Sequence, residues 1–226
     1  MSQSTGGRRP RTPPPEPPGG QVWQGALTAT VAAGREFYHV SRAHHVSGRY
    51  FGTGPGARFN APAGQYGVFY AGTTLECAVL EMISVTRQPQ GPCEVVEAEI
   101  AGWKAWKIKI NRPLKVCVLA GTGLRAIGAD VRITGGDDYD LSQRWSFAIH
   151  QNASMWDAIY YTTRHGDDLT ALAIFARADA AITVTEWGVL NDRAVPDLWI
   201  EMSRILRDNH IHLLPSWVRG AAPPGS

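Results

Sequence analysis

A short apolar strand that leads directly into an amphipathic helix is the feature that most constrains this chain. Residues 68–71 form an apolar and aromatic run between glycines, which predicts a buried strand. The helix expected over residues 73–83 carries apolar side chains at i, i+4 and i+7 on one face: Leu75, Val79 and Met82. Thr73 and Glu76 have the spacing of a capping box, so we expect the helix to begin there.

Three side chains with chemical potential lie in and around this unit. Arg58 precedes the strand in a loop, Tyr70 lies on the strand, and Glu81 lies on the helix. An arginine can hold phosphate bidentately, a tyrosine face can stack on a heterocycle, and a carboxylate can stabilise an oxocarbenium-like centre. Together they suit an anionic ligand that develops positive charge during reaction. On spacing alone, the favoured alternative is a solvated arginine, a core tyrosine ring and an exposed helix charge.

Three motifs follow one another in this region: Gly-Ala-Arg-Phe-Asn at residues 56–60, Gly-Val-Phe-Tyr-Ala at 67–71, and Leu-Glu-Cys-Ala-Val-Leu-Glu at 75–81. Together they resemble the RES domain, the toxin of RES–Xre toxin–antitoxin pairs. The family pattern has a second glycine where this chain has Ala57, and a tryptophan where it has Phe59. Both changes are mild.

A second block resembles the C-terminal half of the same family. It consists of a helix expected over residues 137–152, a strand over 156–164 and a further strand over 172–175. Thr163 stands at the position of the family serine, with Tyr161 and Arg164 beside it. Threonine keeps the hydroxyl but adds a methyl group. The alternative is a strand hydroxyl that bonds neighbouring backbone.

The first expected strand, residues 36–41, departs from the family pattern. RES domains usually carry an aromatic–arginine pair here, and that arginine is expected to help bind the nucleotide. This chain has Tyr38 followed by His39, with Arg42 three residues further on. Two hypotheses follow: His39 substitutes weakly, or Arg42 reaches the same place from the loop. His39 is equally compatible with a core position.

The resemblance implies an α+β fold similar to ADP-ribosyltransferases, with a split β-core, surrounding helices and NAD⁺ bound in a cleft. It implies an enzyme that cleaves the nicotinamide–ribose bond of NAD⁺ by phosphorolysis or hydrolysis. The alternatives are an ADP-ribosyltransferase that modifies a protein target and a non-catalytic NAD-binding or partner-binding module. The expected catalytic residues are Arg58, Glu81 and Tyr70, and the expected substrate-binding residues are Arg42, His39, Tyr161, Thr163 and Arg164. NAD⁺, inorganic phosphate and an Xre-type antitoxin are the expected partners.

Length and composition set further limits. The 226 residues predict one domain over residues 22–215, between a disordered Pro/Gly-rich tail at 1–21 and a flexible tail at 216–226. A net charge of +2 and dispersed basic residues give no reason to expect direct nucleic-acid binding. Neither a metal-ligand motif nor a Cys-x-x-Cys pair is present, so no metal is expected. Three cysteines, no long apolar run and no secretory signal favour a cytoplasmic protein without a membrane span.

Five more elements and one loop complete the expected fold. Residues 42–67 are rich in Gly, Arg, His and Pro and predict a long functional loop. Alternating apolar and charged residues predict strands at 93–100 and 105–110, and a short apolar run predicts another at 116–119. Residues 192–214 predict a helix with Pro196 in its first turn, followed by a last strand at 211–214.

Overall fold

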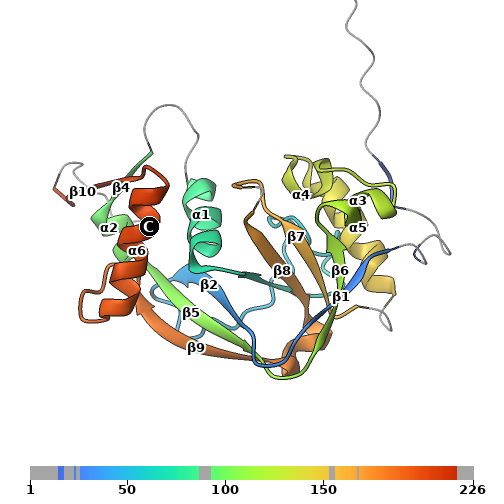
Figure 1. Cartoon of the computed structure of the whole chain (residues 1–226), viewed down its shortest axis with the longest axis horizontal. Coiled ribbons are helices and arrows are strands. Elements are labelled where there is room, and N and C mark those ends of the chain that lie inside the picture. The colour runs from blue at the N-terminus through green and yellow to red at the C-terminus, as the bar shows by residue number, and fades with distance from the viewer. Residues whose placement is uncertain are drawn as a thin grey trace, which may run out of the picture.

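A mixed eight-stranded sheet runs through the protein in a computed structural model that describes residues 15–17, 23, 26–86, 93–152, 156–166 and 168–217 (Figure 1). Its strand order is β1-β6-β7-β8-β3-β2-β5-β9. The strands are β1 (Thr28–Val31), β2 (Glu36–Arg42), β3 (Val68–Gly72), β5 (Trp103–Ile110), β6 (Leu114–Leu119), β7 (Ala158–Thr162), β8 (Thr170–Phe175) and β9 (Ile182–Val189). The helices are α1 (Leu75–Thr86), α2 (Glu97–Ala101), α3 (Thr122–Ala126), α4 (Arg132–Gly135), α5 (Tyr139–Gln151), the 3₁₀ helix η2 (Ala176–Ala181) and α6 (Pro196–Asp208).

The sheet is split between β2 and β3. These two strands pair only at Tyr38 and Gly72, whereas β2 pairs with β5 along its whole length. One half of the sheet is therefore β2, β5 and β9, and the other is β1, β6, β7, β8 and β3, as the two diverging groups of ribbons in Figure 1 show. The predicted α+β fold with a split β-core and surrounding helices is confirmed.

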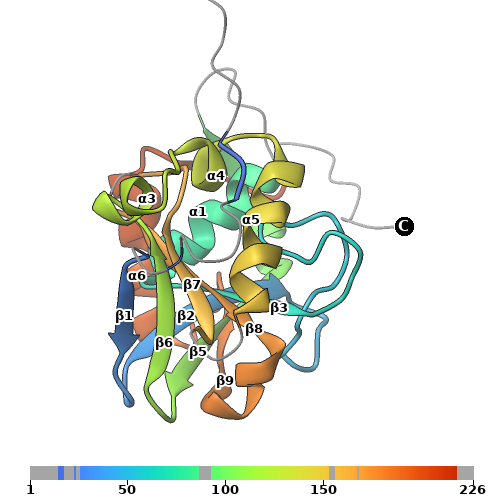
Figure 2. The ribbon, with the colours of Figure 1, turned by 90° about the vertical axis from the view of Figure 1, so that its right-hand side faces the viewer.

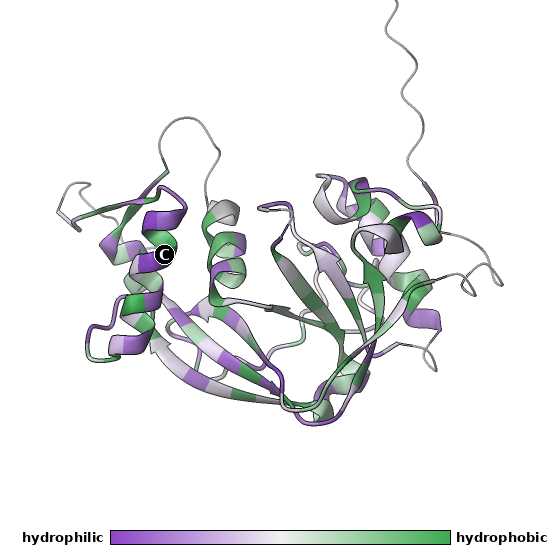
Figure 3. Ribbon diagram, in the orientation of Figure 1, coloured by the Kyte–Doolittle hydropathy of each residue, from purple (hydrophilic) through white to green (hydrophobic). Residues whose placement is uncertain are grey.

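The hydropathy of the strands follows their place in the sheet. β8 is hydrophobic along its length and buried from Ala171 to Phe175, whereas β5 alternates between hydrophobic and charged residues (Figure 3). A strand that is covered on both faces needs apolar side chains on both, and a half-exposed strand does not. Both the 105–110 and 172–175 predictions are confirmed.

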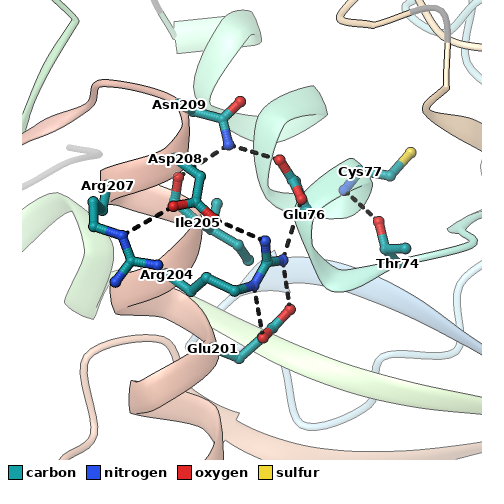
Figure 4. A network of polar contacts seen from close by, with 9 residues as sticks. All are labelled: Thr74, Glu76, Cys77, Glu201, Arg204, Ile205, Arg207, Asp208 and Asn209. Atoms are coloured by element: carbon teal, nitrogen blue, oxygen red, sulfur yellow. Dashed lines mark hydrogen bonds and ion pairs between the residues drawn. The ribbon is translucent and has the colours of Figure 1, made fainter.

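Helix α1 begins almost where predicted, but with a different cap. The Thr74 hydroxyl accepts the Cys77 backbone N–H at 3.1 Å, so Thr74 and not Thr73 caps the helix. The Thr73 hydroxyl instead donates to the Thr170 carbonyl of β8 at 2.9 Å. The predicted capping box is wrong because both of its members are engaged elsewhere: Glu76 points to α6 (Figure 4).

Helix α6 holds α1 from the side. Arg204 binds Glu76 at 3.2 Å and Glu201 at 2.8 Å, and the Asn209 amide donates to Glu76 at 2.7 Å (Figure 4). Beneath this polar network the two helices share one apolar cluster that includes buried side chains of both: Leu75, Val79, Leu198, Met202 and Ile205. The predicted helix with Pro196 at its start is confirmed. Because this face of α1 is buried, the opposite face, with Cys77 and Glu81, is directed toward the other half of the sheet.

The strand predicted over residues 93–100 is wrong in its second half. The sequence predicted one strand, whereas the structure has a short strand β4 (Glu94–Val96), paired in parallel with β10 (His212–Leu214), and then α2. The Glu99 side chain accepts the Val96 backbone N–H at 3.0 Å. A carboxylate that alternation assigns to a solvated strand face therefore stabilises the first turn of a helix instead.

Helix α5 covers the other half of the sheet (Figure 2). Asp138 caps it by accepting the Leu141 N–H at 3.1 Å, and Leu141, Trp145 and Ile149 form its buried stripe, so the helix predicted over residues 137–152 is confirmed. The strand β7 that follows is also confirmed, although it ends at Thr162 rather than at residue 164.

Most of the predicted tails lies outside the described residues. An exception is 15–17, where the Trp145 indole N–H donates to the Pro15 carbonyl at 2.8 Å and Arg144 binds both Glu16 oxygens at 3.0 Å. Pro15 and Glu16 of the 1–21 segment therefore contact α5. Within the described part of the chain, no helix has the length and apolar character needed to cross a membrane.

Candidate functional site

Tyr70 fixes the loop that carries Arg58. Its phenol oxygen accepts the Phe59 backbone N–H at 2.8 Å and donates to the Asn60 side-chain oxygen at 3.0 Å. Burial raises the pKa of the Tyr70 phenol above its ordinary range, so the hydroxyl stays protonated. The tyrosine is thus a structural link from β3 to the two residues that follow Arg58 in the loop.

Arg58 is 9% exposed and extends from its loop to the α4–α5 connection. Its Nη1 donates to the Gly136 carbonyl at 2.6 Å, and the guanidinium lies 4.9 Å from the centre of the Tyr139 ring. No hydrogen bond from Nε or Nη2 to another described residue is present. Those two nitrogens are available to an anionic ligand, while the rest of the group is held in place.

The charges of two arginines act on the Glu81 carboxylate. Its side chain is 38% exposed, and burial raises the pKa of its carboxyl, while the charges of Arg58 and Arg164 lower it. Burial and the nearby charge of Glu81 both raise the pKa of the Tyr161 phenol, so this hydroxyl stays protonated beside the carboxylate. The Tyr161 ring also meets Phe59 edge-on, with 4.8 Å between ring centres. Side chains from a loop, a helix and a strand therefore interact in one place.

The turn after β7 completes this arrangement. Thr163 is buried at 6% exposure, and its hydroxyl accepts the His165 backbone N–H at 3.4 Å. Arg164 forms an ion pair with Asp137 at 3.2 Å. His165 Nε2 lies 3.6 Å from Glu81 Oε1, which makes His165 a site residue that the sequence did not reveal. The sequence signal that could have indicated His165 is its position directly after Thr163 and Arg164.

His39 is not a cation in this structure. Its Nδ1 lies 2.9 Å from the Tyr70 carbonyl oxygen and its ring packs 4.9 Å from Phe69. Burial lowers the pKa of His39 to about 4, so the imidazole is neutral at pH 7 and donates Nδ1–H to that carbonyl. The hypothesis that it replaces the family arginine by charge does not fit, and the alternative of a core histidine does.

Arg42 lies on the other side of α1. Its guanidinium stacks 3.9 Å from the centre of the Trp103 ring. Together with Val79 and Ile83, Arg42 lines a cavity of about 110 Å³ that α2 and α6 also border. Val79 and Ile83 are on the helix face opposite Glu81, so Arg42 does not reach the Glu81 cluster as the second hypothesis required.

Comparisons with known proteins identify the family and the fold. The model of the RES domain family matches residues 36–199. This chain belongs to the RES domain family. Its fold is also that of a chain in the crystal structure of the M. tuberculosis MbcT–MbcA toxin–antitoxin complex, with a TM-score of 0.56 at 16% identity over 81% of this chain and 94% of the other. No curated protein sequence matches it.

In this RES domain, six of the eight predicted site residues gather around Glu81 or support those that do: Arg58, Tyr70, Glu81, Tyr161, Thr163 and Arg164. The other two, His39 and Arg42, supply no cation there. Within the described ranges, no group of three or more His, Cys, Asp or Glu side chains is placed to hold a metal ion.

Proposed function

We propose that this RES domain cleaves the nicotinamide–ribose bond of NAD⁺, with water or inorganic phosphate as acceptor. The observation that carries the proposal is a partly buried carboxylate, Glu81, under the influence of two guanidiniums, Arg58 and Arg164. A dinucleotide presents the complementary pattern, since its diphosphate is anionic and its ribose becomes positive as the glycosidic bond breaks.

The two arginines would bind the anionic part. Arg58 offers Nε and Nη2 while Gly136 and Tyr139 fix its guanidinium plane, so little side-chain entropy is lost on binding. Arg164, held by Asp137 at the rim, would contact the second phosphate or the incoming inorganic phosphate.

Glu81 would stabilise the ribosyl centre. Its partial burial lowers the local dielectric, which strengthens attraction between the carboxylate and the developing oxocarbenium charge. The leaving nicotinamide is neutral, and it departs with the electron pair of the broken C–N bond. No protonation of the leaving group is needed.

The remaining side chains would shape the nicotinamide and ribose subsites. The Tyr70 hydroxyl is committed to Phe59 and Asn60, so only its ring is available to pack on the ligand. The Thr163 hydroxyl accepts a long bond of 3.4 Å from the His165 N–H and would orient the nicotinamide amide or a phosphate.

We also propose that the protein acts as a toxin with an antitoxin partner. Membership of the RES family and the shared fold with a chain of a toxin–antitoxin complex support this extension. Expression of the protein should arrest growth, and co-expression of a neighbouring helix-turn-helix protein of Xre type should relieve the arrest.

The test is to incubate the purified protein with NAD⁺, with and without phosphate, and to follow free nicotinamide and the adenine-containing product. Label from adenine-labelled NAD⁺ that remains on a protein band would identify ADP-ribosyl transfer instead. Tight NAD⁺ binding without consumption would identify a binding module. Absence of nicotinamide with water, phosphate and candidate protein acceptors contradicts the proposal.

A further inference from the structure

His165 faces the Glu81 carboxylate across a short gap. Its Nε2 lies 3.6 Å from Glu81 Oε1, and its side chain is only 17% exposed. The turn that carries it is closely packed, because a Cβ on Gly166 would lie 3.0 Å from the Asp168 side-chain oxygen and 3.2 Å from Leu169. With its N–H on the Thr163 hydroxyl, the backbone around His165 is held on both sides.

The surroundings keep the imidazole neutral. Burial and the charges of Arg164 and Arg58 lower the pKa of His165. Titratable and charged groups from several elements act on the Glu81–His165 pair. They are Cys77 of α1, Arg58 of the loop before β3, Tyr161 of β7, and Arg164, which forms an ion pair with Asp137. At neutral pH the ring therefore has a lone pair on one nitrogen.

The gap has the size of a bridged contact. A separation of 3.6 Å exceeds a direct hydrogen bond, but one oxygen atom at about 2.8 Å from each partner fits beside both atoms. In the tautomer with Nδ1 protonated, Nε2 accepts a proton from a hydroxyl at that point. Glu81 accepts or orients the same hydroxyl from the other side.

We propose that His165 is the general base that takes the proton from the acceptor when the acceptor is water, an inference that rests on the proposed function. The bond from ribose C1′ to nicotinamide breaks, and its electron pair stays on the nicotinamide nitrogen. The water oxygen bonds to C1′, and one of its protons passes to His165 Nε2. Glu81, 3.6 Å away, stabilises the imidazolium that forms, which later releases the proton to solvent.

An acceptor that carries no proton separates general-base catalysis by His165 from the rest of the reaction. Azide is an anion that attacks C1′ without a base, whereas water needs one. His165→Asn keeps a polar group near the place of Nδ1 but removes the basic Nε2. It should lower water-dependent nicotinamide release by about 100-fold or more. Azide-dependent release should stay within about threefold of the unmodified protein, since general-base catalysis does not contribute to it.

Two further measurements exclude a purely structural effect. Free imidazole should restore water-dependent release to His165→Ala, because it can enter the space left by the ring. His212→Asn, on an exposed residue of β10, is the matched control and should leave both reactions unchanged.

Other outcomes overturn the inference. Wild-type release with phosphate or azide but not with water contradicts it and leaves the proposed function standing. Equal losses with water and azide in His165→Asn, or an unchanged water reaction, assign His165 a structural role or none. No nicotinamide from the wild type with any acceptor removes the inference and the proposed function together.

Discussion

The Tyr70 hydroxyl of β3 accepts the Phe59 backbone N–H at 2.8 Å, so this strand residue holds the loop at the position directly after Arg58. Tyr70→Phe keeps the ring but leaves the Phe59 N–H and the Asn60 side-chain oxygen without this partner. We predict a loss of about 1–3 kcal/mol in the free energy of unfolding, measured by denaturant titration. Tyr50→Phe, on a ring that is 71% exposed, is the control and should change little. Equal stabilities for the two variants would show that the hydroxyl does not hold the loop.

Arg58 should not tolerate replacement by lysine. Lysine keeps the charge but loses the planar fork, the Gly136 bond and the stacking on Tyr139. For Arg58→Lys we predict a KM for NAD⁺ about tenfold higher or more, from steady-state nicotinamide release. Arg125→Lys in α3, at an exposed position, should behave as the wild type. An unchanged KM in Arg58→Lys would remove Arg58 from the diphosphate subsite.

The acid limb of the activity profile should depend on Arg164. Activity requires Glu81 ionised and His165 neutral, so it rises as pH rises through their pKa values. The charge of Arg164 lowers both values, and Arg164→Gln therefore raises both. The acid limb of kcat/KM should move to higher pH in this variant. A limb that stays in place or moves to lower pH contradicts the assignment of these charges to one site.

Histidine burial should make the protein less stable in acid. Burial lowers the pKa of His39 to about 4, whereas an unfolded histidine titrates at about 6.5. Below about pH 6.5 the unfolded state binds a proton that the folded state does not, so the free energy of unfolding falls as pH drops toward 4. His150, whose pKa is also about 4, adds to the same window. His39→Gln should therefore make the fall shallower in pH-dependent denaturation, and an unchanged slope would mean that His39 is not buried as a neutral ring.

The polar network between α6 and α1 should stabilise the helix that carries Glu81. Arg204→Ala removes the ion pair with Glu76 near the start of the helix that carries Glu81. Because Arg204 is 37% exposed, we predict a modest loss of about 1 kcal/mol in the free energy of unfolding. The double variant with Glu76→Gln should lose less than the sum of the two single variants, since both break one contact. Strict additivity would show that the pair contributes no coupling. Arg193→Ala, in a more exposed pair with Glu97, is the control.

Local periodicity predicted the elements that form the framework of the site. β3, α1, α5, β7 and β8 each carry a clear strand or helix pattern, because one face or both faces of each are buried in the same core. Family motifs then located Arg58, Glu81 and Arg164, whose charges interact although the residues are far apart in sequence. Hydrophobic periodicity and family motifs are both local signals, so they can be read from the sequence without knowledge of tertiary contacts.

Tertiary contacts decided what the sequence did not predict. Glu99 returns to the Val96 N–H and makes a helical turn where alternation predicts a strand. The stacking of Arg42 on Trp103 needs the β2–β5 pairing, which no local pattern reveals. The strand β9 lies at the edge of the sheet with several exposed residues, so its apolar signal is weak. The approach of His165 to Glu81 depends on the β7–β8 turn meeting α1.

Nicotinamide release from NAD⁺ by the wild type and by Glu81→Gln, followed in parallel by proton NMR, tests the central claim most directly. The substitution keeps the shape of the side chain and removes only its charge, and Glu36→Gln, at the exposed first residue of β2, is the matched control. We predict that the wild type and Glu36→Gln release nicotinamide at equal rates and that Glu81→Gln is slower by about 100-fold or more. Release by Glu81→Gln at the wild-type rate, or no release by the wild type, would contradict it.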